Sequence, residues 1–129
     1  MPGKAYWIEA PHLMSLDYEG HVGPEDLEAV TTEGLQAVEQ GPVYFIVDLS
    51  RMTTNPPAMI RASSKVKPFI DLVNHLNSRW FALVGPNIFA QLAIQVFFRN
   101  TGFKIFKERP EAEAFLRSMI EREIQRKGD

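Results

Sequence analysis

The fold of this chain is decided by the run Val43-Tyr44-Phe45-Ile46-Val47-Asp48. Its first five residues are apolar with no alternating polar side chains, which is typical of a strand buried on both faces of a parallel sheet. The run Arg79-Trp80-Phe81-Ala82-Leu83-Val84 has the same character and predicts a second strand of this kind. We therefore expect Phe45 and Phe81 to lie side by side in the middle of one sheet.

Segments on both sides of these two runs complete an alternating pattern of strands and helices. Residues 6–9 and 13–18 predict an N-terminal hairpin, and residues 103–107 predict a last short strand. Apolar residues at helical spacing follow Pro24, Met59, Pro86 and Pro110. The predicted order is β-β-α-β-α-β-α-β-α, and right-handed crossovers then place the last three strands in a largely parallel sheet with the hairpin at one side. The sequence therefore predicts an α/β fold, with residues 1–129 forming a single domain.

Composition and charge exclude several classes of protein. The chain has 129 residues, a formal net charge of -2 and no cysteine, which excludes disulfides and cysteine-ligated metal sites and removes the electrostatic argument for nucleic-acid binding. No apolar run approaches the roughly 20 residues of a transmembrane helix. Because Glu9 interrupts the N-terminal apolar region, no signal peptide is expected either, and we predict a cytoplasmic location.

Charge is distributed unevenly along the chain. Residues 1–50 hold nine acids and one base, Lys4, whereas residues 51–129 hold thirteen bases and seven acids, so that the two parts carry net charges of -8 and +6. Two explanations remain open. Either the two parts pack against each other and partly neutralise their charges, or the protein presents a polarised surface to a partner.

Sequence motifs for catalysis are absent, and the three histidines give no firm metal site. Asp17, Glu19 and His21 alternate along one predicted strand and could hold a metal together with His12, but an exposed hairpin edge has the same composition. His75 is expected to cap or pack near the end of a helix. We predict a protein that is not an enzyme, with no catalytic residue, no metal and no cofactor.

The most informative predicted loop covers residues 48–54. It follows the carboxyl end of a buried parallel strand, where open α/β sheets bind ligands and partners. Its candidate residues are Ser50, Arg51, Thr53 and Thr54, which offer either a phosphoacceptor or an anion-binding loop. Helix capping by one of the hydroxyls would explain the same composition.

A second group of candidate residues lies on the predicted helix 87–99. Gln91, Gln95 and Arg99 form its polar line, while Ile88, Leu92 and Phe98 flank that line away from a core face of Phe89, Ala93 and Phe97. The flanks could be covered by the last helix, by a second copy of the protein or by an apolar ligand. The candidate pocket or interface consists of Trp80, Phe89, Leu92, Phe97 and Phe98.

Four segments of the chain resemble the SpoIIAA-like proteins of the STAS/SEC14-like group. They are Leu16-Asp17-Tyr18-Glu19-Gly20-His21-Val22-Gly23-Pro24-Glu25-Asp26-Leu27, Phe45-Ile46-Val47-Asp48-Leu49-Ser50, Trp80-Phe81-Ala82-Leu83-Val84-Gly85 and Phe103-Lys104-Ile105-Phe106. This resemblance implies a sheet flanked by helices and a non-enzymatic role. The implied role is either protein–protein switching, as in anti-sigma factor antagonists, or the binding of small, often lipid-like molecules.

The resemblance also bears on a switch residue. In the antagonist branch, a segment of the type Asp-Ser-Ser-Gly follows Asp-Leu-Ser and carries the phosphorylated serine. Here the matching stretch is Met52-Thr53-Thr54-Asn55-Pro56-Pro57, in which only Thr53 or Thr54 could take that position. We therefore expect a regulatory or interaction module with a protein partner or self-association, and alternatively a binding module for a small apolar ligand.

Overall fold

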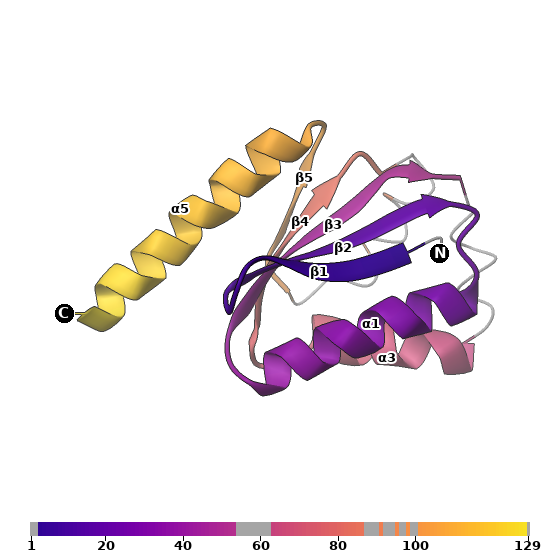
Figure 1. Ribbon diagram of the computed structural model, residues 1–129, viewed down its shortest axis with the longest axis horizontal. Helices are drawn as coiled ribbons and strands as arrows, with labels where there is room; N and C mark the ends of the chain where they lie inside the picture. The colour runs from indigo at the N-terminus through magenta and orange to yellow at the C-terminus, as the bar shows by residue number, and fades with distance from the viewer. Residues whose placement is uncertain are drawn as a thin grey trace.

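The computed structural model describes residues 3–53, 63–86 and 101–128, together with residues 91, 95 and 98. The described part contains five strands and three long helices in the predicted alternation (Figure 1). They are β1 (Gly3–Glu9), β2 (Leu13–Gly20), α1 (Pro24–Glu39), β3 (Val43–Met52), α3 (Ser63–Val73), β4 (Ser78–Val84), β5 (Phe103–Phe106) and α5 (Arg109–Gly128).

The strands form one mixed sheet in the order β1-β2-β3-β4-β5. β1 and β2 are the antiparallel hairpin, and every other neighbouring pair is parallel, which confirms the predicted α/β fold. Phe45 pairs with Phe81 in the register of β3 and β4, and their rings stack with centroids 5.2 Å apart. The two apolar runs therefore form the centre of the sheet, as predicted.

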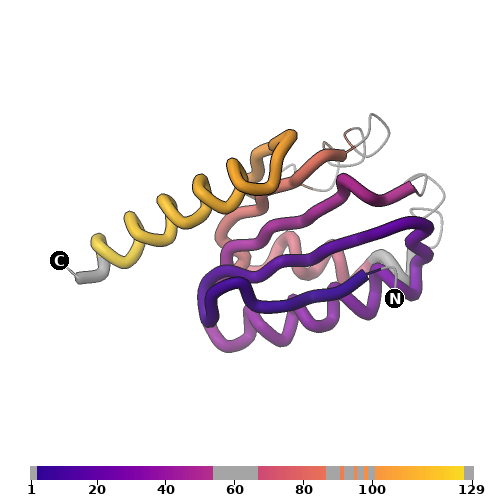
Figure 2. Tube along the Cα trace, turned by 45° about the horizontal axis from the view of Figure 1, so that its top comes forward, coloured from indigo at the N-terminus to yellow at the C-terminus, as the bar shows by residue number. Residues whose placement is uncertain are grey.

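Helices cover the two faces of the sheet unequally. α1 and α3 lie together on one face, and α5 lies on the other (Figures 1 and 2). Alternate side chains of β3 point to opposite faces of the sheet. Phe45 and Val47 belong to the larger core under α1 and α3, whereas Tyr44 and Ile46 belong to the smaller core under α5. Both faces are apolar because both are covered, which is why the central strands show no alternation.

Two boundaries differ from the sequence prediction. β3 continues to Met52, so Ser50 and Arg51 belong to a strand and not to a loop. The reason is that β2 extends to Gly20 and supplies backbone partners, with Arg51 opposite Glu19 and Met52 opposite Gly20. α3 ends at Val73, which places His75 in the following turn, where its Nδ1 accepts a hydrogen bond from the backbone N–H of Asn77.

The structure corrects the predicted grouping of Trp80 with Phe98. Phe98 is 2% exposed and packs against Phe69, Phe81 and Phe103 in the core under α1 and α3. Trp80 packs on the opposite face, against Phe115 of α5. One pocket cannot contain both side chains. Phe98 lies in the turn before β5, where the helical spacing used for the prediction no longer applies.

The other members of that group, Phe89, Leu92 and Phe97, lie outside the described residues, as does Thr54. Gln91 and Gln95 are described and exposed, which agrees with the predicted polar line of the helix. None of the described helices is long and apolar enough to cross a lipid bilayer.

Candidate functional site

Polar residues of three strands meet the first residue of α5 at one edge of the sheet. Asp17 of β2 and Asp48 of β3 are paired in register, so their side chains lie on the same face of neighbouring strands about 4.8 Å apart. Two carboxylates in this arrangement repel each other and require a cation. Arg109 supplies it, because its Nη1 donates to Asp17 Oδ1 at 3.0 Å and to Asp48 Oδ2 at 3.2 Å.

The hairpin adds two hydroxyl groups to this cluster, which we call the Arg109 network. Tyr6 pairs with Ser15 across β1 and β2, and both side chains reach the guanidinium. Nη2 of Arg109 donates to the Tyr6 hydroxyl at 2.7 Å and to Ser15 Oγ at 3.0 Å. The Tyr6 hydroxyl in turn donates to Asp17 Oδ2 at 2.8 Å, and Ser15 Oγ donates to Asp17 Oδ1 at 2.5 Å. Nε of Arg109 is 3.4 Å from Glu113 Oε1, one turn along α5.

These contacts shift the pKa values of the groups in the network. Burial acts to raise the pKa of Asp17, but hydrogen bonds from Ser15, Tyr6 and Arg109 outweigh it, so the pKa lies below its ordinary value. Burial opposes the charge on Arg109, yet the hydrogen bond to Asp17 and its charge raise the pKa of the guanidinium. Burial and the hydrogen bond to Asp17 also raise the pKa of Tyr6. Asp17 and Arg109 therefore stay charged at neutral pH.

The network extends to the surface through Ser50. The backbone N–H and the Oγ of Ser50 donate to Asp48 Oδ1 at 3.0 Å and 2.6 Å, while the other carboxylate oxygen of Asp48 accepts from Arg109. Gly85 lies directly against Ser50: it has a φ of +63°, and a Cβ at that position would be 2.7 Å from the Cβ of Ser50. The glycine that follows β4 thus permits the close approach of Ser50 on β3.

The Arg109 network forms the floor of an open cleft of about 430 Å³, which we call the rim cleft. Exposed charged side chains surround it. Three are cations, Lys4, Arg51 and Lys107, and two are acids, Glu19 and Glu108. None of these five forms an ion pair with another described residue. One guanidinium against two carboxylates leaves the interior with a net negative charge, so that the four cations and the four acids lining the cleft balance.

Sequence reasoning located part of this site and missed the rest. Ser50 and Arg51 line the rim cleft, whereas Thr53 lies just past β3, where its backbone N–H donates to the carbonyl of Gly20. Arg109, Tyr6 and Ser15 were not singled out, and Asp17 was considered only as a metal ligand. The available signal was the pair of acids in buried strands, because a buried carboxylate needs a partner.

The rim cleft is lined by carboxylates, hydroxyl groups and cations. Among the described residues, no three His, Asp or Glu side chains come together as a metal site. Ser15 and Ser50 each donate to a carboxylate, and no histidine is among the residues that line the cleft. Its side chains can bind charged groups through hydrogen bonds and ion pairs.

Comparison with known proteins bears on the fold. No family model matches the chain, and no curated protein matches it. Among solved structures, it is similar to an uncharacterized protein of the DUF3478 family with a SpoIIAA-like fold from Shewanella loihica PV-4. The TM-score is 0.58 and the sequence identity is 17%, over 88% of this chain and 94% of that chain. The chain therefore has a SpoIIAA-like fold, as the resemblance of its sequence segments implied.

Proposed function

We propose that the protein is a non-catalytic interaction module that binds a partner protein in the rim cleft, through a segment that carries charges of both signs. The observation that carries this proposal is the set of exposed charges around the cleft. All five of these side chains, Lys4, Arg51, Lys107, Glu19 and Glu108, are without ion-pair partners among the described residues. Complementary charges of this kind govern the selection of partners and the rate of association.

The Arg109 network supports this role from below. Arg109 holds Asp17 and Asp48 through two ion pairs, which fix the ends of β2 and β3 relative to α5. A site on rigid elements loses less conformational entropy when a partner binds. The SpoIIAA-like fold is consistent with a regulatory role of the type implied by the resemblance to anti-sigma factor antagonists.

Charge reversal in the rim cleft tests the proposal. The double variant Arg51→Glu, Lys107→Glu changes the net charge by the same amount as the control Lys67→Glu, Arg122→Glu, whose sites are exposed and do not line the cleft. Proteins captured on the wild type from an extract of the source cells would be purified, and their affinities for all three forms measured by calorimetry. We expect a partner protein that binds the wild type and the control alike, and the cleft variant at least about ten-fold more weakly, because acidic groups of the partner lose Arg51 and Lys107.

Equal binding by the cleft variant and the control would refute the proposal, and so would failure to capture any protein that binds in purified form. Turnover of a substrate that is lost in the cleft variant would refute the non-catalytic assignment.

A second candidate function is the binding of a small apolar molecule. The observation in its favour is a smaller cavity between α5 and the turn joining β1 and β2, which has isoleucine and leucine side chains in its wall. Native mass spectrometry after mild purification tests this alternative. An additional mass that organic extraction removes would support it, and a mass equal to that of the chain alone would count against it.

A further inference from the structure

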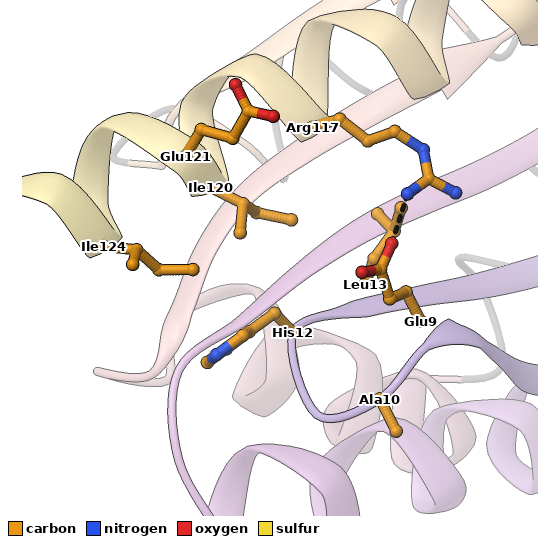
Figure 3. A pocket seen from close by; sticks show the side chains of 8 residues that line it. All are labelled: Glu9, Ala10, His12, Leu13, Arg117, Ile120, Glu121 and Ile124. Carbon is orange, nitrogen blue, oxygen red and sulfur yellow. Dashed lines mark hydrogen bonds and ion pairs between the residues drawn. The ribbon is translucent and has the colours of Figure 1, made fainter.

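The cavity beneath the second half of α5 is a separate site from the rim cleft. It has a volume of about 180 Å³ and lies between α5 and the β1–β2 turn (Figure 3). The rim cleft borders residues 107–110, whereas this cavity borders Arg117, Ile120, Glu121 and Ile124. We call it the α5 cavity. The two sites share no lining residue, so each can be tested without the other.

The inner wall of the α5 cavity is apolar. Leu13 is almost fully buried on the sheet side, and Ile120 and Ile124 extend from α5 toward the β1–β2 turn (Figure 3). Ile124 is 53% exposed, which leaves an apolar side chain facing water at the cavity. An apolar group placed between these residues would remove their surface from water at a gain of about 25 cal/mol per Å². The wall therefore favours the hydrocarbon part of a ligand.

The charges of the cavity are arranged at its edges. Glu9 and Arg117 bind each other across one end, which neutralises both (Figure 3). Glu121 lies at the outer edge on α5 and has no ion pair with another described residue. His12 lies on the turn side, with its Nδ1 3.5 Å from the carbonyl oxygen of Pro42. With Glu9 and Arg117 paired, Glu121 is the acid at the cavity that has no ion-pair partner among the described residues.

We propose that the α5 cavity binds a small organic cation, a primary amine with a short alkyl or aryl stem. The stem would lie between Ile120, Ile124 and Leu13, and the ammonium group would stay at the outer edge beside Glu121. The cavity volume equals that of about six water molecules at roughly 30 Å³ each, which suits a stem of about six carbons.

Titration of the full-length protein with three probes of equal length tests the proposal. Hexylammonium, hexanol and hexanoate differ only in the head group, and amide chemical shifts in two-dimensional NMR spectra report both affinity and location. We expect hexylammonium to bind most tightly and to shift the amides of residues 9–13 and 117–124. Glu121→Gln should weaken its binding by about five-fold, the effect of one ion pair at close range in water. Glu111→Gln, an exposed acid in the first turn of α5, is the matched control and should leave binding unchanged.

The wall is tested by Ile124→Ser, which should weaken hexylammonium and hexanol alike because it removes apolar surface common to both complexes. Ile124 is exposed, so this variant should fold normally, and its melting temperature checks that it does. The proposal is overturned if hexanol or hexanoate binds as well as hexylammonium, if Glu121→Gln and Glu111→Gln behave alike, or if no probe shifts the cavity amides at millimolar concentration. None of these results bears on binding of a partner protein at the rim cleft.

Discussion

Replacement of Arg109 by alanine is the most direct test of how α5 is attached to the sheet. The substitution removes the donor of every hydrogen bond that joins Asp17 and Asp48 to α5. It leaves two carboxylates opposite each other on β2 and β3, with side-chain exposures of only 22% and 18%. Breaking a fully buried ion pair costs about 3–5 kcal/mol. Because these groups keep some contact with water, we expect a loss of about 2–4 kcal/mol in the free energy of unfolding.

The same substitution should change the pH dependence of stability. In the native protein the pKa of Asp17 is below its ordinary value of 3.8, so the ionised carboxylate stabilises the folded state above about pH 4. That contribution disappears as the pH falls through the lowered native pKa, because Asp17 is then protonated in both states. Without Arg109, the pKa of Asp17 in the native protein rises, because the hydrogen bond and the charge that lower it are removed. The difference in stability between wild type and Arg109→Ala should therefore be largest at neutral pH and shrink as the pH falls below 4.

Urea unfolding followed by the fluorescence of Trp7 and Trp80 measures both effects, at pH 7 and at pH 3. Arg117→Ala is the matched control, since Arg117 lies on the same helix and pairs with Glu9, but both side chains are well exposed. Exposed pairs contribute about 0–1 kcal/mol, so this variant should lose little. The reasoning is refuted if the two variants lose the same stability at pH 7, or if the deficit of Arg109→Ala is the same at both pH values.

Two further substitutions test the core and the floor of the rim cleft. Phe98→Ala should lower the free energy of unfolding, measured in urea, by about 3–5 kcal/mol, because Phe98 is almost fully buried among aromatic rings. A loss under about 1 kcal/mol would contradict this burial. Gly85→Ala should lower the free energy of unfolding by at least about 2 kcal/mol, because both the left-handed backbone and the contact with Ser50 oppose a side chain. Gly20→Ala is the control, since Gly20 has a similar φ but no neighbour within 4 Å of the added Cβ, and it should cost about 1–2 kcal/mol. Equal melting temperatures for the two glycine variants would show that the contact with Ser50 is unimportant.

The central sheet could be predicted from sequence because its signal is local. The strands around Phe45 and Phe81 are continuous apolar runs, and burial on both faces leaves no other simple explanation for them. The end of β3 could not be found in this way. Ser50 and Arg51 are polar and resemble a loop, and they belong to a strand only because β2 reaches far enough to pair with them.

The Arg109 network could be predicted only in part, because its members are far apart in sequence. Arg109 is 103 residues from Tyr6 and 61 from Asp48, and nothing in the local sequence of either strand specifies that partner. Asp17 and Asp48 signal the need for a cation only once β2 and β3 are known to pair in register, which the sequence analysis did not predict. Phe98 was assigned to the wrong face for a related reason: helical periodicity fixes directions within a helix, and Phe98 lies in the turn after it.

The order in which the elements are synthesised gives the attachment of α5 a further consequence. α5 follows all five strands in the chain, so a nascent polypeptide has every strand available before the helix that covers one face. Until the ribosome has released residues 109–116, Ile46, Ala82 and Val84 have no cover, and Asp17 and Asp48 have no counter-ion. Such intermediates expose apolar surface that promotes aggregation. Chaperone dependence during translation should therefore be concentrated in the interval between β5 and the emergence of α5.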